Sequence, residues 1–175
     1  DVMLQNGAQM SYALDVGSYQ LVWKHRQHPR VEVMEHTNFR YSKLADFKRG
    51  QPSFASIDVS FISLHLILPP LHAIIENGGE VVALIKPQFE AGRENVGKHG
   101  IVRDHAVHTA VLTDIVNFAQ SAGYNVLGLD YSPIKGGEGN IEFLVHLQAT
   151  DDTAEVKPVV SIEKTQQAAY DQLNK

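Results

Sequence analysis

Cysteine is absent from this sequence of 175 residues, and tryptophan occurs only once. Without thiols the chain can form neither a disulfide framework nor a thiolate metal site, and nothing in its composition favours secretion. No apolar run approaches the roughly 20 residues that a membrane-spanning helix requires. The first residues also lack the basic and apolar regions of a signal peptide. These absences predict a soluble, cytoplasmic protein.

Positive charge is also scarce, because 15 lysines and arginines face 20 aspartates and glutamates, for a net charge of -5. Proteins that bind nucleic acid by bulk electrostatics cluster lysine and arginine against the phosphates. Because the net charge is negative, any binding of nucleic acid is expected to use a local patch of positive charge or another domain. An apolar content of 43% is enough to bury a core, and the length predicts one domain with extensions.

The most informative stretch is the apolar run Val81–Ile85, which ends abruptly in Lys86 and Pro87. Five consecutive apolar residues after a Gly-Gly turn predict a strand buried on both faces of a parallel sheet. Open α/β sheets bind ligands outside the carboxyl ends of their strands, so Lys86 is a candidate catalytic residue. The alternative is that Lys86 is only the polar residue that ends the strand.

Three earlier segments also predict short strands, namely 12–17, 31–35 and 54–60, of which 31–35 alternates apolar and acidic residues. Acids lie at or near the carboxyl ends of the first and third. Asp15 is suited to receive ribose hydroxyls, or to cap a helix predicted over Tyr19–Lys24, on which Trp23 is expected to pack in the core. Asn38 follows the second strand, where it is suited to read an adenine edge or to satisfy its own turn. Asp58 lies near the carboxyl end of the third segment, 54–60.

Helix signals follow two of these strands. Ser60 or Ser63 is expected to begin a helix over Leu64–Ile75, which two prolines bend or split. Asp104 caps the best-defined helix, whose apolar residues recur at helical spacing up to a closing glycine. Three histidines near this helix lack the further ligands of a metal site, so no metal is predicted; they are His99, His105 and His108.

A glycine-rich charged loop over Phe89–Arg103 precedes that helix. Loops of this length inside a domain are commonly functional, although a solvated surface loop is the alternative. The loop and a second one after it hold four candidate contacts to a polyanionic substrate, namely Arg93, Lys98, Arg103 and Lys135.

The segments Asn125–Pro133 and Asn140–Leu147 are joined too closely for a crossover helix, so they predict antiparallel neighbours at one sheet edge. Glu142 either faces solvent there or enters the cleft. The resulting fold class is α/β, Rossmann-like, with a mostly parallel doubly wound sheet that carries one antiparallel strand. Residues 1–149 form this domain, and 150–175 form a linker and a C-terminal helix.

Four long motifs resemble the hemolysin A (TlyA) family of FtsJ-like RNA methyltransferases; they lie at 58–64, 83–93, 97–104 and 132–143. The resemblance, which extends to about Gln148, implies S-adenosyl-L-methionine as cofactor and ribose 2′-O-methylation of ribosomal RNA, or of ribosomal subunits, as activity. It implies that Asp58, Lys86 and Glu142 belong to a Lys-Asp-Lys-Glu catalytic set. The residues implied along the cofactor are Asp15, Val16, Asn38 and Asp58.

In that family an S4 RNA-binding domain precedes the methyltransferase domain. Two further features, a glycine-rich cofactor loop and the first catalytic lysine, are expected upstream of Asp1. The opening residues Val2–Gly7 likewise read as the end of a helix closed by a C-cap glycine, which predicts chain before them. The sequence as given is expected to bind cofactor weakly.

The chemistry leaves alternatives open. Lys86 either removes the hydroxyl proton as a base or remains charged and stabilises the developing alkoxide. Two other functions compete with methylation: a pore-forming or membrane-lytic hemolysin, and a catalytically inactive RNA-binding module on a methyltransferase scaffold. The first would require a spanning or strongly amphipathic segment, and the sequence contains none.

Overall fold

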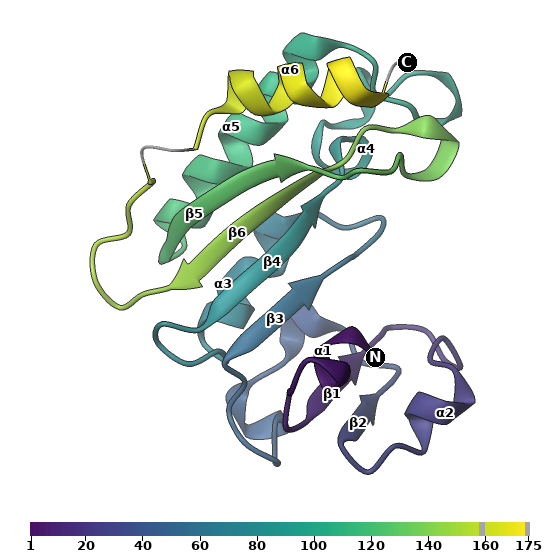
Figure 1. Ribbon diagram of the computed structural model, residues 1–175, viewed down its shortest axis with the longest axis vertical. Helices are drawn as coiled ribbons and strands as arrows, with labels where there is room; N and C mark the ends of the chain where they lie inside the picture. Colours follow the sequence, from purple (N-terminus) through teal and green to yellow (C-terminus); the bar gives the residue numbers. More distant parts are fainter. Residues whose placement is uncertain (158–159, 174–175) are drawn as a thin grey trace. The chain divides into compact units, whose positions relative to one another are not determined.

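The computed structural model describes residues 1–157 and 160–173, whose six strands form two hydrogen-bonded sheets (Figure 1). The chain divides into two compact units, Asp1–Gly50 and Gln51–Lys175. The predicted division into residues 1–149 and 150–175 remains a prediction, and residues 158–159 and 174–175 of its second part lie outside the described residues.

The first unit is built on two parallel strands, β1 (Ser11–Leu14) and β2 (Val31–Met34), which pair in register over four residues each. The short helix α1 (Val2–Gln5) precedes β1, and Gly7 adopts a φ of +96°, in agreement with the predicted glycine stop. Two 3-10 turns follow β2, at Phe39–Tyr41 and Leu44–Asp46.

The helix predicted over Tyr19–Lys24 is wrong, because α2 spans only Trp23–Arg26. Tyr19 has a φ of +59°, and its N–H donates to the Glu35 carboxylate at 2.7 Å. The chain around Tyr19 therefore forms a turn that this carboxylate stabilises, and the helix starts only at Trp23. The prediction that Trp23 packs in the core is also wrong, since 68% of it is exposed. A helix of one turn has too few residues to present a buried face.

The second sheet contains four strands in the order β3-β4-β6-β5, seen side by side in Figure 1. Their bounds are Phe54–Ile57 (β3), Glu80–Ile85 (β4), Phe143–Ala149 (β6) and Tyr124–Tyr131 (β5). β3 and β4 are parallel, whereas β6 is antiparallel to both of its neighbours. The predicted antiparallel strand and its edge neighbour are thereby confirmed.

The described strands form two hydrogen-bonded sheets rather than one continuous ladder, so a single sheet edge shared by Asp15, Asn38, Asp58 and Lys86 stays a prediction. β1 pairs only with β2, and β3 pairs only with β4. No described strand is hydrogen-bonded to both sheets, and a continuous ladder requires such a strand. Each sheet nevertheless places its own polar residues at the carboxyl ends of its parallel strands.

The core of the second unit lies on one face of its sheet. Cross-strand pairs of fully buried residues connect β4 to β6, namely Val81–Leu147, Ala83–Val145 and Ile85–Phe143. The other face of the sheet is only half-buried. The prediction that the strand Val81–Ile85, which lies in β4, is buried on both faces is therefore correct for one face alone. The reason is alternation, because this other face carries polar pairs: Val82 lies beside His146, and Glu80 lies beside Gln148.

Helices cover the sheet as the sequence indicates. Ser63 accepts a hydrogen bond from the His65 N–H and begins a 3-10 turn at Leu64–Leu66, after which α3 spans Leu68–His72, so the predicted helix is indeed split. Asp104 caps α5, which spans His105–Ser121 and is followed by the predicted closing glycine, Gly123, with a φ of +91°. Among the described residues, no helix has the length and apolarity to cross a membrane.

The C-terminal helix α6 (Ile162–Leu173) docks against α5 and β5 within the second unit. Polar contacts hold it there: Thr165 donates to the Leu129 carbonyl at 3.2 Å, and Gln166 donates to the His105 carbonyl at 3.2 Å. The predicted linker before it is partly ordered by the sheet, since Val156 forms a parallel bridge with Val126.

Burial of His108 at the α5–α6 contact predicts a pH-dependent stability. Desolvation lowers the pKa of His108 below its usual 6.5, and His105 acts in the same direction, while the Val102 backbone and Asp104 oppose the shift. The unfolded chain therefore binds a proton more readily than the folded chain does. As a result, the free energy of unfolding falls as the pH drops through about 6.5.

Denaturant unfolding of wild type and His108→Asn between pH 7.5 and 5.5 measures this contribution. We expect wild type to lose more stability than the variant over that range. His99→Asn is the matched control, because His99 is exposed and its φ of +66° suits asparagine. A His108→Asn profile parallel to wild type would contradict the prediction.

Candidate active site

The carboxyl ends of β3 and β4 and the start of β6 meet at one edge of the four-stranded sheet. Lys86 directly follows Ile85, and Glu142 directly precedes Phe143, which is the register partner of Ile85. Asp58 follows β3, the parallel neighbour of β4. The structure therefore brings all three predicted catalytic residues to the same edge.

Lys86 is the centre of this site. Its Nζ lies 2.6 Å from Asp58 Oδ1 and 3.3 Å from Ser60 Oγ, to which it donates a hydrogen bond. The Lys86 side chain is only 14% exposed, whereas that of Asp58 is 73% exposed. The aliphatic stem is thus buried, and the ammonium is held at the surface by an open carboxylate.

Glu142 is buried, with 6% of the residue exposed, so the alternative of an outward carboxylate on a solvated face is wrong. Gln88 Nε2 donates to Glu142 Oε1 at 2.8 Å. Gly136 packs so closely that a Cβ built there would lie 2.1 Å from Glu142 Oε1. The carboxylate is therefore fixed from two sides, by an amide and by a glycine backbone.

The one-turn helix α4 (Pro87–Glu90) connects these parts. Lys86 precedes it, Gln88 lies within it, and Glu90 at its end accepts hydrogen bonds from the Ser63 hydroxyl at 2.6 Å and the Leu64 N–H at 2.9 Å. Burial raises the pKa of Glu90, and the bonds from Ser63 and Leu64 oppose that shift. α4 thus links the loop that follows β3 to the start of β6.

Phe61 is a residue of this site that the sequence did not single out. It is 91% exposed, its φ is +61°, and its ring lies 4.9 Å from that of Phe89 on α4. A bulky residue with positive φ is a conformational outlier, and outliers of this kind cluster at functional sites. No local sequence signal distinguishes Phe61 from a core phenylalanine.

Gln88 and Glu90 are two further residues of this site that the sequence analysis did not predict, although their position shortly after Lys86 was a usable signal.

The predicted cofactor residues of the first unit lie at the carboxyl ends of β1 and β2. Asp15 is exposed, and its Oδ1 accepts the Gly17 N–H at 2.7 Å, which forms a turn rather than a helix cap. Val16 beside it is 69% exposed. Asn38 Oδ1 accepts from both the backbone N–H and Nε of Arg40 at 3.2 Å, so the turn role foreseen for Asn38 is confirmed.

The four predicted substrate-binding cations separate into two pairs. Arg103 and Lys135 line one pocket, whereas Arg93 and Lys98 lie on exposed 3-10 turns at Arg93–Asn95 and Lys98–Gly100 and do not line it. Within residues 1–157 and 160–173, no group of three potential ligands could hold a metal ion.

Comparison with known proteins identifies relatives of this chain. The family model for FtsJ-like methyltransferases matches residues 1–149. The chain is 61% identical over 147 residues to "Putative rRNA methyltransferase YqxC" of Bacillus subtilis (strain 168), covering 84% of this chain and 52% of that protein. It is 36% identical over 154 residues to "16S/23S rRNA (cytidine-2'-O)-methyltransferase TlyA" of Mycobacterium tuberculosis (strain CDC 1551 / Oshkosh), covering 88% and 57%.

The solved structure "Putative hemolysin from Streptococcus thermophilus" superposes with a TM-score of 0.96 at 56% identity, covering 99% of this chain and 62% of that one. The chain therefore spans little more than half the length of these relatives. The structure "Crystal structure of putative S-adenosylmethionine dependent methyltransferase from Listeria monocytogenes", 13% identical and covering 86% of this chain and 84% of that one, superposes with a TM-score of 0.58, which shows a shared fold.

Proposed function

We propose that this chain, which belongs to the FtsJ-like methyltransferase family, transfers a methyl group from S-adenosyl-L-methionine to a ribose 2′-hydroxyl of ribosomal RNA. The resemblance to hemolysin A (TlyA) proteins is confirmed by the same comparisons. The observation that carries the proposal is the Lys86–Asp58 pair at a sheet edge that also holds Glu142.

The geometry favours an electrostatic role for Lys86. Lys86 Nζ lies 2.6 Å from Asp58 Oδ1 and forms an ion pair with it. The ammonium of that pair would stabilise the negative charge that develops on the 2′-oxygen as its proton passes to solvent water at the exposed Asp58 carboxylate and the oxygen takes the methyl group. Asp58 and Ser60 orient that ammonium, so the protein chiefly aligns and stabilises the acceptor.

Glu142 and Gln88 complete the acceptor site in this proposal. The carboxylate of Glu142 is held by the Gln88 amide at 2.8 Å and has little freedom because Gly136 packs against it. We assign Gln88 as a positioning residue that acts through Glu142. Phe61 supplies an exposed ring on which an unstacked base of RNA could lie, since bases in single-stranded RNA commonly stack on aromatic side chains.

The first unit fits the cofactor that the family implies. S-adenosyl-L-methionine supplies an electrophilic methyl group on a sulfonium. Its ribose hydroxyls need an acceptor such as the exposed Asp15 carboxylate, and its adenine needs an apolar surface and an amide, which Val16 and Asn38 offer. A Cβ on Gly17 would come within 3.1 Å of Asp15 Oδ1, so glycine leaves that carboxylate accessible. The role of Asp58 along the cofactor stays a prediction.

Ribosomal RNA, free or in a ribosomal subunit, is the proposed substrate and partner, and it places the reaction in the cytoplasm. Support comes from the relatives whose names specify rRNA methylation. The net charge of -5 remains unfavourable for bulk phosphate binding. We therefore propose that the described chain contributes local contacts beside the reacting ribose and that other parts of a longer protein supply most of the affinity.

Transfer of a radiolabelled methyl group tests this function. The protein is incubated with labelled S-adenosyl-L-methionine and unmethylated ribosomal subunits, and nuclease digestion with mass spectrometry identifies the modified position. Label on a ribose 2′-oxygen is the expected result. Binding of cofactor and RNA without transfer would instead indicate an inactive RNA-binding module, and lysis of erythrocytes without transfer would indicate a membrane-active protein.

Asp15→Asn is expected to weaken S-adenosyl-L-methionine binding about tenfold, since a hydrogen bond to a charged acceptor contributes about 1.5–3 kcal/mol. The asparagine oxygen still accepts the Gly17 N–H, so the turn and the free energy of unfolding should persist. Calorimetric titration measures the affinity. Asp152→Ala, which removes an exposed carboxylate elsewhere, is the charge control. Equal affinities for Asp15→Asn and wild type would exclude Asp15 from the cofactor site.

A further inference from the structure

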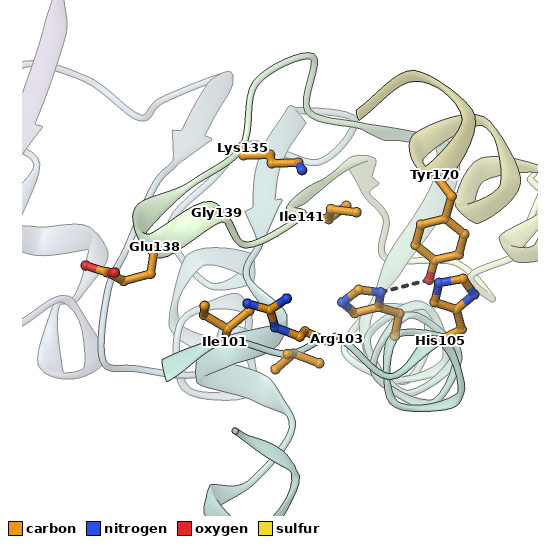
Figure 2. A pocket seen from close by; sticks show the side chains of 10 residues that line it. Ile101, Arg103, His105, Lys135, Glu138, Gly139, Ile141 and Tyr170 are labelled. Carbon is orange, nitrogen blue, oxygen red and sulfur yellow. Dashed lines mark hydrogen bonds between the residues drawn. The ribbon is translucent and has the colours of Figure 1, made fainter. Parts of the chain in front are cut away.

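A pocket of about 370 Å³ lies in the second unit (Figure 2). Its walls come from the segment that leads into α5, from the loop between β5 and β6, and from α6. Small-molecule sites have volumes of roughly 300–1,000 Å³, so the pocket holds more than a single phosphate. The side chains that matter below are Arg103, His105, His108, Lys135 and Tyr170.

The pocket is pre-formed rather than a gap between mobile loops. Asn140, which is 3% exposed, accepts the Val102 N–H at 3.0 Å and donates to the carbonyls of Gly100 at 2.9 Å and Gly137 at 3.0 Å. One buried amide therefore fastens the two loops that form opposite walls. A ligand that enters meets a frame that needs little reorganisation, which reduces the entropic cost of binding.

The β5–β6 loop is a wall shared with the proposed acceptor site. Gly136 packs against the Glu142 carboxylate, while its neighbour Lys135 and the residues Glu138, Gly139 and Ile141 line the pocket. A ligand in this pocket is thus separated from Glu142 by a single loop.

Two kinds of chemistry converge in the pocket. Lys135 and Arg103 enter from different walls, and Figure 2 shows the Glu138 carboxylate pointing away from the other labelled side chains. This arrangement suits an anion. At another wall, His105 and Tyr170 stack at 3.6 Å between ring centroids, and the Tyr170 hydroxyl bonds His108 Nδ1 at 2.8 Å.

His108 also leaves a polar atom for a ligand. The residue is 1% exposed, and its Nε2 has no hydrogen-bond partner of normal geometry among the described residues, although the Val102 backbone lies close enough to affect its pKa. Buried polar atoms without partners are costly and rare. An atom of this kind at a pocket wall points to a ligand group that hydrogen-bonds it.

We infer that this pocket binds one nucleotide of the RNA substrate next to the methylated one. Arg103 and Lys135 hold its phosphate, and its base lies at the aromatic wall of His105 and Tyr170 with an edge toward His108. This assignment rests on the proposed function, since it identifies the partner of the cations as RNA.

Direct binding tests the pocket without catalysis. Cytidine 5′-monophosphate is titrated into the ¹⁵N-labelled protein, and amide shifts are followed by NMR, with cytidine and ribose 5-phosphate as partial probes. We expect shifts confined to residues 101–108, 135–141 and α6, with weaker binding of each partial probe. Arg103→Ala/Lys135→Ala should weaken binding about tenfold. Lys164→Ala, which removes an exposed cation from α6, is the control and should bind like wild type.

The methylation assay then separates this inference from the proposed function. We expect the double variant to raise KM for ribosomal subunits about tenfold and to leave KM for S-adenosyl-L-methionine unchanged. Methylation by wild type without any mononucleotide shift at the pocket, or with an unchanged KM in the double variant, would overturn the nucleotide site. Pocket shifts in a protein that methylates no RNA would support the site and overturn the proposed function.

Discussion

Lys86→Ala is expected to lower the rate of methyl transfer by roughly 10²–10³-fold, the usual cost of removing one group that stabilises developing charge in a transition state. Affinity for S-adenosyl-L-methionine should stay nearly intact, because Lys86 contacts Asp58 and Ser60 at the acceptor side. Single-turnover transfer of labelled methyl groups measures the rate, and calorimetric titration measures cofactor affinity.

Lys86→Arg distinguishes the two roles left open by the sequence. An arginine keeps the positive charge but does not lose its proton in proteins. If Lys86 acts through its charge, as the ion pair with Asp58 favours, the arginine variant should be measurably faster than the alanine variant. Equal rates for both variants would assign Lys86 as the base. A loss of cofactor affinity as large as the loss of rate would contradict the acceptor-side assignment.

Gly136→Ala is expected to reduce the rate by about 10²-fold, because displacing a catalytic group by about 1 Å has that order of effect. The added Cβ would lie 2.1 Å from Glu142 Oε1, so the carboxylate must move. The backbone itself accepts alanine, since Gly136 has a φ of -74°. Overpacking of this kind should also lower the free energy of unfolding by about 1–3 kcal/mol. Denaturant unfolding and single-turnover kinetics measure the two effects.

Gly137→Ala is the matched control, because a Cβ at the next residue meets nothing within 4 Å. Its stability should stay within about 0.5 kcal/mol of wild type. Combining Gly136→Ala with Glu142→Asp tests the clash itself: the shorter carboxylate makes room, so stability should be partly restored while the rate stays low. Equal rates of methyl transfer for Gly136→Ala and Gly137→Ala would contradict the prediction, because they would mean that catalysis does not depend on the position of the Glu142 carboxylate.

Local signals were sufficient to predict most elements of the second unit. The apolar run before Lys86, the Asp104 cap, the periodic helix and the close hairpin each depend on residues a few positions apart, which is the range over which propensity, capping and alternation act. The same signals placed Asp58, Lys86 and Glu142 at strand ends. Once the strand directions were known, those ends had to meet at one edge.

Burial, by contrast, was decided only in three dimensions. Trp23 was expected inside and is exposed, while Glu142 was expected to face either solvent or a cleft and is buried. The division into two sheets was likewise invisible in the sequence, because pairing depends on which strands come into hydrogen-bonding distance.

The contacts that hold the site together connect residues far apart in the chain. Gln88 bonds Glu142 across 54 positions, Glu90 bonds Ser63 across 27, and Asn140 bonds Val102 across 38. Sequence spacing carries no information about such contacts, since they depend on the packing of whole elements rather than on local backbone preference. The amino-acid sequence therefore determined the chemical groups and the strand ends that carry them, and the tertiary structure decided which of those groups touch.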